Sequence, residues 1–201
     1  MFEFKNEKHV IANPAVCHDY IYNSSSKVIL SAGQLLKIKG YERVIEVARK
    51  ILFKYPDWKW VICGEGPERQ KLEKLILDAK LTNQVLLLGT VDDMDSQYKK
   101  AATYVLTSDM EGLPMVLLEA KSWGLPLVSF DIMTGPSDVI IDEVNGYLIK
   151  PYDIDAMAEK IEILISDKDK RVQFSANAQM DMQKFEEKYI ISQWETIIGV
   201  E

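Results

Sequence analysis

The chain has 201 residues, of which 47% are hydrophobic, and its formal net charge at pH 7 is −7. This length and hydrophobic content are enough to bury a core, so we expect a globular domain without disulfide or metal support. The excess of carboxylates and the lack of a Lys/Arg-rich segment exclude a general nucleic-acid binder. Cys17 and Cys63 are far apart and lack metal-ligand spacing, which predicts two free thiols in a reducing compartment.

The sequence shows neither a signal peptide nor an apolar segment long enough to cross a bilayer. We therefore expect the protein in the cytoplasm, and peripheral association with the inner face of the cell membrane stays open. No group of His, Cys, Asp or Glu has metal-ligand spacing. Neither a metal ion nor another cofactor is expected.

Residues 1–27 are polar and contain turn-forming clusters, which predicts a linker. From residue 28 onward, short apolar segments alternate with segments whose apolar residues have helical spacing. We expect strands at 28–32, 58–63, 85–88, 102–107, 125–129 and 146–149, and helices at 41–54, 67–79, 92–101, 114–123 and 137–141. Nearly continuous apolar strands between amphipathic helices favour a parallel sheet covered on both faces. The expected fold class is α/β, with a Rossmann-like sheet.

The last part of the chain is expected to form helices at 153–165, 168–183 and 185–197. The third of these carries a broadly apolar side. This side either packs on the core of the domain or docks on a second domain, and the sequence leaves both interpretations open. Its apolar residues are Phe185, Tyr189, Ile190, Trp194 and Ile197.

Residues 108–120 contain two carboxylates, Glu111 and Glu119, on either side of a Gly-x-Pro turn. The strand expected at 102–107 places Glu111 in a loop at a strand's carboxyl end, where open α/β sheets bind their ligands. Glu119 lies about one turn into the helix that follows, within reach of the same site. Ionised carboxylates accept hydrogen bonds from paired hydroxyls, as in vicinal diols.

Pro114 suits the first turn of the helix that follows, because its missing N–H is not needed there. The N–H groups of Met115, Val116 and Leu117 are then expected to point outward together. Such a helix start attracts phosphate. Together with the two carboxylates, this arrangement indicates a sugar nucleotide as the ligand.

Four motifs occur in a characteristic order, namely residues 33–40, 64–67, 111–114 and 135–138, and the third begins a Glu-x7-Glu pair. In this order they resemble the C-terminal, donor-binding half of the family 4 retaining glycosyltransferases, which have the GT-B fold. The resemblance runs from about residue 13 to the C-terminus.

The resemblance implies three parts of the chain. Residues 1–27 would be an interdomain linker with a remnant of the preceding domain, and residues 28–183 would form the nucleotide-sugar-binding domain. Residues 184–201 would form a C-terminal helix that docks on an N-terminal domain missing from this chain.

The resemblance also implies roles for single residues. Glu111 would reach hydroxyls of the donor sugar and Lys39 would lie on the diphosphate, so both are expected to be catalytic. A fixed cation stabilises the negative charge that builds up as the nucleoside diphosphate departs. The residues implied in donor-sugar and phosphate binding are Gly33, Gln34, Gly112, Leu113, Pro114, Met115 and Val116, and those implied in nucleotide binding are Glu119, Gly64, Gly66 and Val91.

At one position the sequence departs from the family pattern. The family usually has an arginine five residues before the lysine that matches Lys39, whereas this chain has Gln34. Glutamine donates a hydrogen bond but carries no charge. Either a neighbouring cation such as Lys37 replaces the arginine, or catalysis is weaker.

The resemblance implies transfer of a hexosyl or N-acetylhexosaminyl group from a nucleotide sugar to a glycan or lipid-linked acceptor, in surface-polysaccharide synthesis. Residues 134–137 resemble members that use UDP-hexoses or UDP-N-acetylhexosamines, so a UDP-sugar is the expected donor. The missing N-terminal domain would bind the acceptor, and the isolated chain is expected to be inactive. Two alternatives stay open: a non-catalytic nucleotide-sugar-binding module, which Gln34 favours, and a nucleotide-sugar epimerase of the same fold.

Overall fold

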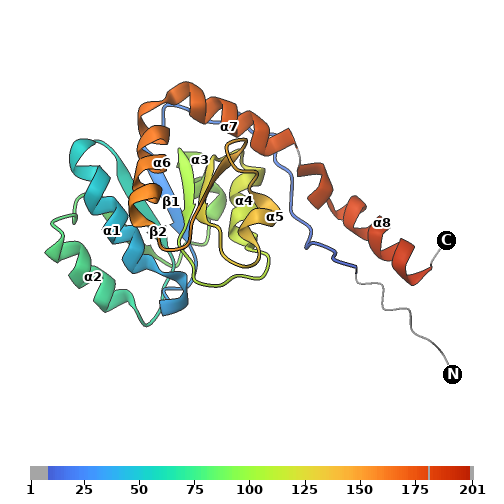
Figure 1. Ribbon diagram of the computed structural model, residues 1–201, viewed down its shortest axis with the longest axis horizontal. Coiled ribbons are helices and arrows are strands. Elements are labelled where there is room, and N and C mark those ends of the chain that lie inside the picture. The colour runs from blue at the N-terminus through green and yellow to red at the C-terminus, as the bar shows by residue number, and fades with distance from the viewer. Residues whose placement is uncertain (1–8, 181, 200–201) are drawn as a thin grey trace.

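The computed structural model describes residues 9–180 and 182–199. At its centre is a six-stranded parallel sheet in the order β3-β2-β1-β4-β5-β6 (Figure 1). The strands are β1 Val28–Ala32, β2 Lys59–Cys63, β3 Val85–Gly89, β4 Thr103–Leu106, β5 Leu127–Phe130 and β6 Gly146–Ile149. This is the strand order of the Rossmann fold, in which the direction of strand addition reverses between β1 and β4 and leaves a ligand-binding crevice at the carboxyl ends.

Helices connect the strands and complete the chain. The α-helices are α1 Tyr41–Ile51, α2 Arg69–Asp78, α3 Met94–Lys100, α4 Met115–Ser122, α5 Pro136–Val139, α6 Ile154–Ser166, α7 Lys168–Met180 and α8 Glu187–Ile198. Three short 3-10 helices accompany them, η1 Lys37–Lys39, η2 Leu52–Lys54 and η3 Met182–Phe185. The 3-10 helices are local turns that the periodicity of apolar residues does not reveal, since each is only three or four residues long.

The sheet is covered on both faces, as the sequence predicts. In β2, Trp60 and Ile62 pack with α1, α2 and α6, whereas Val61 and Cys63 pack with α3, α4 and α5. Figure 1 shows α1 and α2 on one side of the sheet and α4 and α5 on the other. Alternate side chains of a strand point to opposite faces, so apolar residues at successive positions supply both cores. The Rossmann-like α/β fold is therefore confirmed.

The expected elements are all present, and most of them have shifted ends. The helix expected at 41–54 ends at Ile51 and continues as the 3-10 turn η2. The helix expected at 168–183 ends at Met180 within the described residues, and η3 follows. Pro114 precedes α4 instead of lying in its first turn, because its ψ of 95° is extended. The prediction for Pro114 is therefore wrong by one position.

The two ends of the described chain lie together beside the domain. The N–H of Ala15 donates to the backbone oxygen of Phe185 at 2.8 Å, and α8 projects away from the sheet (Figure 1). Phe185 and Ile190 are buried, but Tyr189 and Trp194 are 48% and 53% exposed. Core packing therefore accounts for only part of the apolar side of this segment, and its docking on a further domain stays a prediction.

No described helix has the length and apolar character needed to cross a membrane.

Candidate functional site

The loops that follow β1, β2 and β3 are hydrogen-bonded to one another at the carboxyl edge of the sheet. The N–H of Gly33 donates to the oxygen of Cys63 at 2.9 Å, and that of Gly64 donates to the oxygen of Gly89 at 2.7 Å. Gly64 has a φ of +140°, and a Cβ atom at this position would lie 2.0 Å from the oxygen of Gly33. Glycine is needed here because any side chain would collide with the neighbouring backbone.

A cavity of about 420 Å³ opens between these loops and α4. This volume lies within the range of small-molecule sites. The cavity brings together six residues that the sequence assigns to donor binding, Gly33, Gln34, Gly64, Val91, Val116 and Glu119. Glu119 is exposed, whereas its neighbours Leu118 and Ala120 are buried. The two apolar neighbours face the core, while Glu119 faces the cavity.

The two residues expected to be catalytic form an ion pair. The Nζ atom of Lys39 lies 2.7 Å from Oε1 of Glu111, and their side chains are 25% and 11% exposed. Lys39 ends the turn after β1, and Glu111 lies in the loop after β4. The pair therefore bridges the two strands between which the order of strand addition reverses, where open α/β sheets bind their ligands.

Hydrogen bonds between the same two loops fix the position of Lys39. The hydroxyl of Thr107 donates to the backbone oxygens of Lys39 and Gly40 at 3.0 and 3.1 Å. The N–H of Asp109 donates to the oxygen of Ile38 at 2.8 Å. The backbone that carries the ammonium group is therefore tied to the end of β4.

Two hydroxyl groups fix Glu111. Ser108 Oγ donates to Glu111 Oε1 at 2.6 Å, and Thr134 Oγ1 donates to the backbone oxygen of Glu111 at 2.6 Å. A Cβ atom on Gly135 would lie 2.1 Å from the oxygen of Gly112, so the loop after β5 lies directly on the Glu111–Gly112 backbone. Ser108 and Lys39 thus hold the carboxylate, and the loop after β5 holds the backbone that carries it.

The start of α4 differs from the sequence prediction in one further respect. The N–H of Leu117 donates to the oxygen of Pro114 at 2.9 Å, so it is not free. In the part of the chain that the structure describes, the N–H groups of Met115 and Val116 have no hydrogen-bond acceptor. Two N–H groups, instead of the three expected, are therefore available at this helix start.

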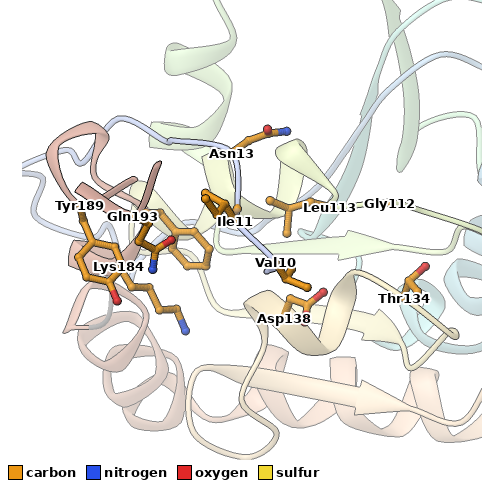
Figure 2. Close-up of a pocket in the computed structure, with 12 residues that line it drawn as sticks. Val10, Ile11, Asn13, Gly112, Leu113, Thr134, Asp138, Lys184, Tyr189 and Gln193 are labelled. Carbon is orange, nitrogen blue, oxygen red and sulfur yellow. The ribbon is translucent and has the colours of Figure 1, made fainter. Parts of the chain in front are cut away.

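Gly112 and Leu113 line a second cavity of about 500 Å³. Figure 2 shows its other walls, which come from the N-terminal segment with Val10, from the region after β5 with Thr134 and Asp138, and from the C-terminal region with Tyr189. The expected site residues therefore do not share one cavity, since Gly112 and Leu113 line the cavity of about 500 Å³ and others line the cavity of about 420 Å³. Lys39, Glu111, Gly66, Pro114 and Met115 line neither of these two cavities.

Two residues next to the carboxylates were missed by the sequence reasoning. Tyr98 donates from its hydroxyl to Glu119 Oε2 at 2.7 Å, and Ser108 binds Glu111 as described above. Ser108 lies three residues before Glu111, and this short spacing was the signal in the sequence that could have identified it as a partner of the carboxylate. Tyr98 was recognisable only as an aromatic residue among polar ones in the helix before β4.

No cluster of three or more His, Cys, Asp or Glu residues that could hold a metal ion occurs within residues 9–180 and 182–199. Metal independence stays a prediction, since it concerns the reaction of the whole enzyme.

Cys63 lies on the wall of the 420 Å³ cavity and gives a testable difference between the two thiols. Burial raises the pKa of Cys63 to about 11 and leaves the residue only 3% exposed. Partial burial and the neighbouring Glu186 also raise the pKa of Cys17, but Cys17 is exposed to the reagent. Because the thiolate is the reactive form, we expect iodoacetamide to label Cys63 at least about tenfold more slowly than Cys17 at pH 7.5. Labelling of Cys63 should accelerate as the pH approaches its pKa. Mass spectrometry of timed samples measures both rates, and equal rates at pH 7.5 would contradict the structure.

The family model described as glycosyl transferases group 1 matches residues 20–181. The chain belongs to this family. An uncharacterized glycosyltransferase of Haemophilus influenzae is 30% identical over 190 residues, which cover 94% of this chain and 54% of that protein. The poly(ribitol-phosphate) alpha-N-acetylglucosaminyltransferase of Staphylococcus aureus is 32% identical over 171 residues, covering 85% of this chain and 35% of that enzyme.

A crystal structure of a Staphylococcus aureus TarM mutant in complex with fondaparinux, alpha-GlcNAc-glycerol and UDP has the same fold. It matches with a TM-score of 0.90 and 30% identity, covering 98% of this chain and 40% of that one. The expected relationship to the C-terminal half of a GT-B glycosyltransferase is confirmed. This chain spans about half, or less, of the length of the curated relatives described here.

Proposed function

We propose that this chain is the donor-binding half of a retaining glycosyltransferase whose donor is a UDP-sugar. The complete enzyme transfers a hexosyl or N-acetylhexosaminyl group to a glycan or lipid-linked acceptor in surface-polysaccharide synthesis. One observation carries the proposal: the Lys39–Glu111 pair and the cavity that contains Glu119 lie together at the carboxyl edge of the sheet.

Each part of the donor has a partner in this arrangement. The ribose diol binds Glu119 in the cavity, and the base lies near Val91. The diphosphate binds the free N–H groups at the start of α4 and the ammonium group of Lys39. An ammonium group has three donors, so Lys39 contacts a phosphate oxygen while it keeps its bond to Glu111.

The chemistry follows from the charge that develops. The bond between the anomeric carbon and the diphosphate oxygen breaks, and a bond to the acceptor oxygen forms on the same face of the sugar. The proton of the acceptor hydroxyl passes to the departing diphosphate. Lys39 and the N–H groups of Met115 and Val116 stabilise the diphosphate most when its charge is greatest. Glu111 holds hydroxyls of the sugar in place.

The choice of UDP rests on similarity. The TarM structure, which is 30% identical to this chain, contains UDP. A further domain supplies the acceptor site and excludes water, and without it this chain binds the donor but transfers little or no sugar. The proposed location is the cytoplasm, with the complete enzyme at the inner face of the membrane when its acceptor is lipid-linked.

Ligand-dependent melting tests the proposal. A ligand that binds only the native state raises its stability, so UDP is expected to raise the melting temperature of this chain more than GDP or ADP. Glu119→Ala and Lys39→Ala should each reduce the shift, because each removes a contact to the nucleotide. Lys50→Ala is the matched control, since Lys50 lies at the other end of α1 in an exposed ion pair with Asp155. An identical UDP shift in all four proteins would contradict the assigned site.

A non-catalytic binding module is the second candidate. Gln34 lies exposed on the cavity, at the position where the family usually has an arginine, so the site lacks one expected positive charge. Such a module shows the UDP shift but supports no transfer when an N-terminal half and acceptors are supplied. Conversion of the sugar nucleotide without an acceptor would instead indicate an epimerase.

A further inference from the structure

Tyr98 is a buried residue whose polar atom reaches the proposed nucleotide cavity. Its side chain is 2% exposed, yet it lines the same cavity as Glu119. Its hydroxyl donates to Glu119 Oε2 at 2.7 Å. A buried donor aimed at a carboxylate in a cavity controls where that carboxylate points.

The surroundings of Tyr98 hold its ring in place. The ring lies against that of Tyr104, with 6.2 Å between the centroids. The hydroxyl of Tyr104 accepts from the N–H of Ala32 and donates to its oxygen, both at 3.0 Å. At the start of α3, the carboxylate of Asp93 accepts from the N–H of Ser96 at 3.0 Å. The Tyr98 ring is therefore anchored to the end of β1 by a buried neighbour.

The hydrogen bond has a fixed direction at neutral pH. Burial is the main cause that raises the pKa of Tyr98 well above its usual value. The neighbouring Tyr104 and the bond to Glu119 raise it further. The phenol therefore stays protonated and acts as a donor. The bond takes one lone pair of Oε2, so Oε1 and the other lone pair of Oε2 are left to accept hydrogen bonds from a ligand.

We propose that Tyr98 is a positioning residue that aims the Glu119 carboxylate at a ribose 2′,3′-diol and thereby makes the site selective for ribonucleotides. The inference rests on the proposed function, in which Glu119 binds the ribose. It adds Tyr98 to the nucleotide site and gives a physical basis for selectivity toward ribonucleotides. A carboxylate that is held in one orientation loses less conformational freedom when it binds a diol.

The test is calorimetric titration of the 201-residue chain with UDP and with 2′,3′-dideoxy-UDP, which lacks the diol. The wild-type chain is expected to bind UDP at least about tenfold more tightly than the dideoxy analogue. Tyr98→Phe keeps the ring and removes the hydroxyl. It should weaken UDP binding about tenfold and leave binding of the analogue unchanged within about twofold. In a Glu119→Ala background, Tyr98→Phe should have no further effect on UDP binding, because the coupled partner is gone.

Tyr22→Phe is the matched control. Tyr22 also has a partly buried phenol, and its hydroxyl donates to the oxygen of Ala102 at 2.6 Å, but it does not line the cavity. This change should leave both affinities unaltered.

Three results would overturn the inference. An equal loss for both ligands in Tyr98→Phe would show that the hydroxyl only supports the shape of the cavity. An unchanged UDP affinity would show that it has no role in binding. If the wild-type chain binds neither ligand, the proposed function fails as well, so the two failures are distinguishable.

Discussion

Replacing Lys39 with methionine is expected to slow sugar transfer by about 100- to 1,000-fold, in a protein that joins this chain to an N-terminal half. Methionine keeps much of the length of the side chain and removes its charge. The side chain of Lys39 is only 25% exposed, and its ammonium group lies 2.7 Å from the Glu111 carboxylate, where water screens it less than at the surface. Its loss is felt mainly as charge builds up on the departing diphosphate, so kcat should fall more than donor affinity.

Initial rates of sugar transfer at saturating and limiting donor measure this effect. Lys50→Met is the control, because it removes a lysine that lies near the end of α1, away from the carboxyl edge of the sheet. A Lys39→Met enzyme that transfers sugar at the rate of the control would exclude Lys39 from the reaction.

Replacing Gly64 with alanine is expected to destabilise the domain by about 3 kcal/mol or more. The added Cβ atom would lie 2.0 Å from the oxygen of Gly33, and both partners of this collision belong to backbone that is hydrogen-bonded into the sheet. The φ of +140° at Gly64 adds strain for any other residue. For a domain of this size, the melting temperature should fall by about 6–12 °C.

Thermal or urea unfolding measures this loss. Gly112→Ala is the control, since a Cβ atom at Gly112 would have no atom within 4 Å. The control should stay within about 0.5 kcal/mol of the wild-type protein. If Gly64→Ala is as stable as the control, the close approach of the loops after β1 and β2 is not present in solution.

The fold was predictable because its signals are local and repeated. The strand at 28–32 and the strand at 146–149 have the expected bounds, since each is a short apolar segment next to turn residues. The ends of the helices were less certain. Whether the chain after Ile51 continues as an α-helix or as the turn η2 depends on tertiary packing, which periodicity does not report.

The site was predictable only where one motif contains the interacting residues or a resemblance supplies them. Glu111, Gly112 and Lys39 were expected from motifs, and the structure places Lys39 and Glu111 in contact across 72 residues. The bond between Tyr98 and Glu119 depends on how α3 packs beside α4, which no spacing in the sequence encodes. Which of the expected residues line the first cavity, the second or neither is likewise a property of the packed loops.

The central claim is that Glu119, Lys39 and the start of α4 bind different parts of one UDP-sugar. A crystal structure of this chain grown with UDP tests it most directly. We expect the ribose on the Glu119 carboxylate and the diphosphate between Lys39 and the N–H groups of Met115 and Val116. Clear density for UDP at another place, or a ribose that leaves Glu119 uncontacted, would contradict it.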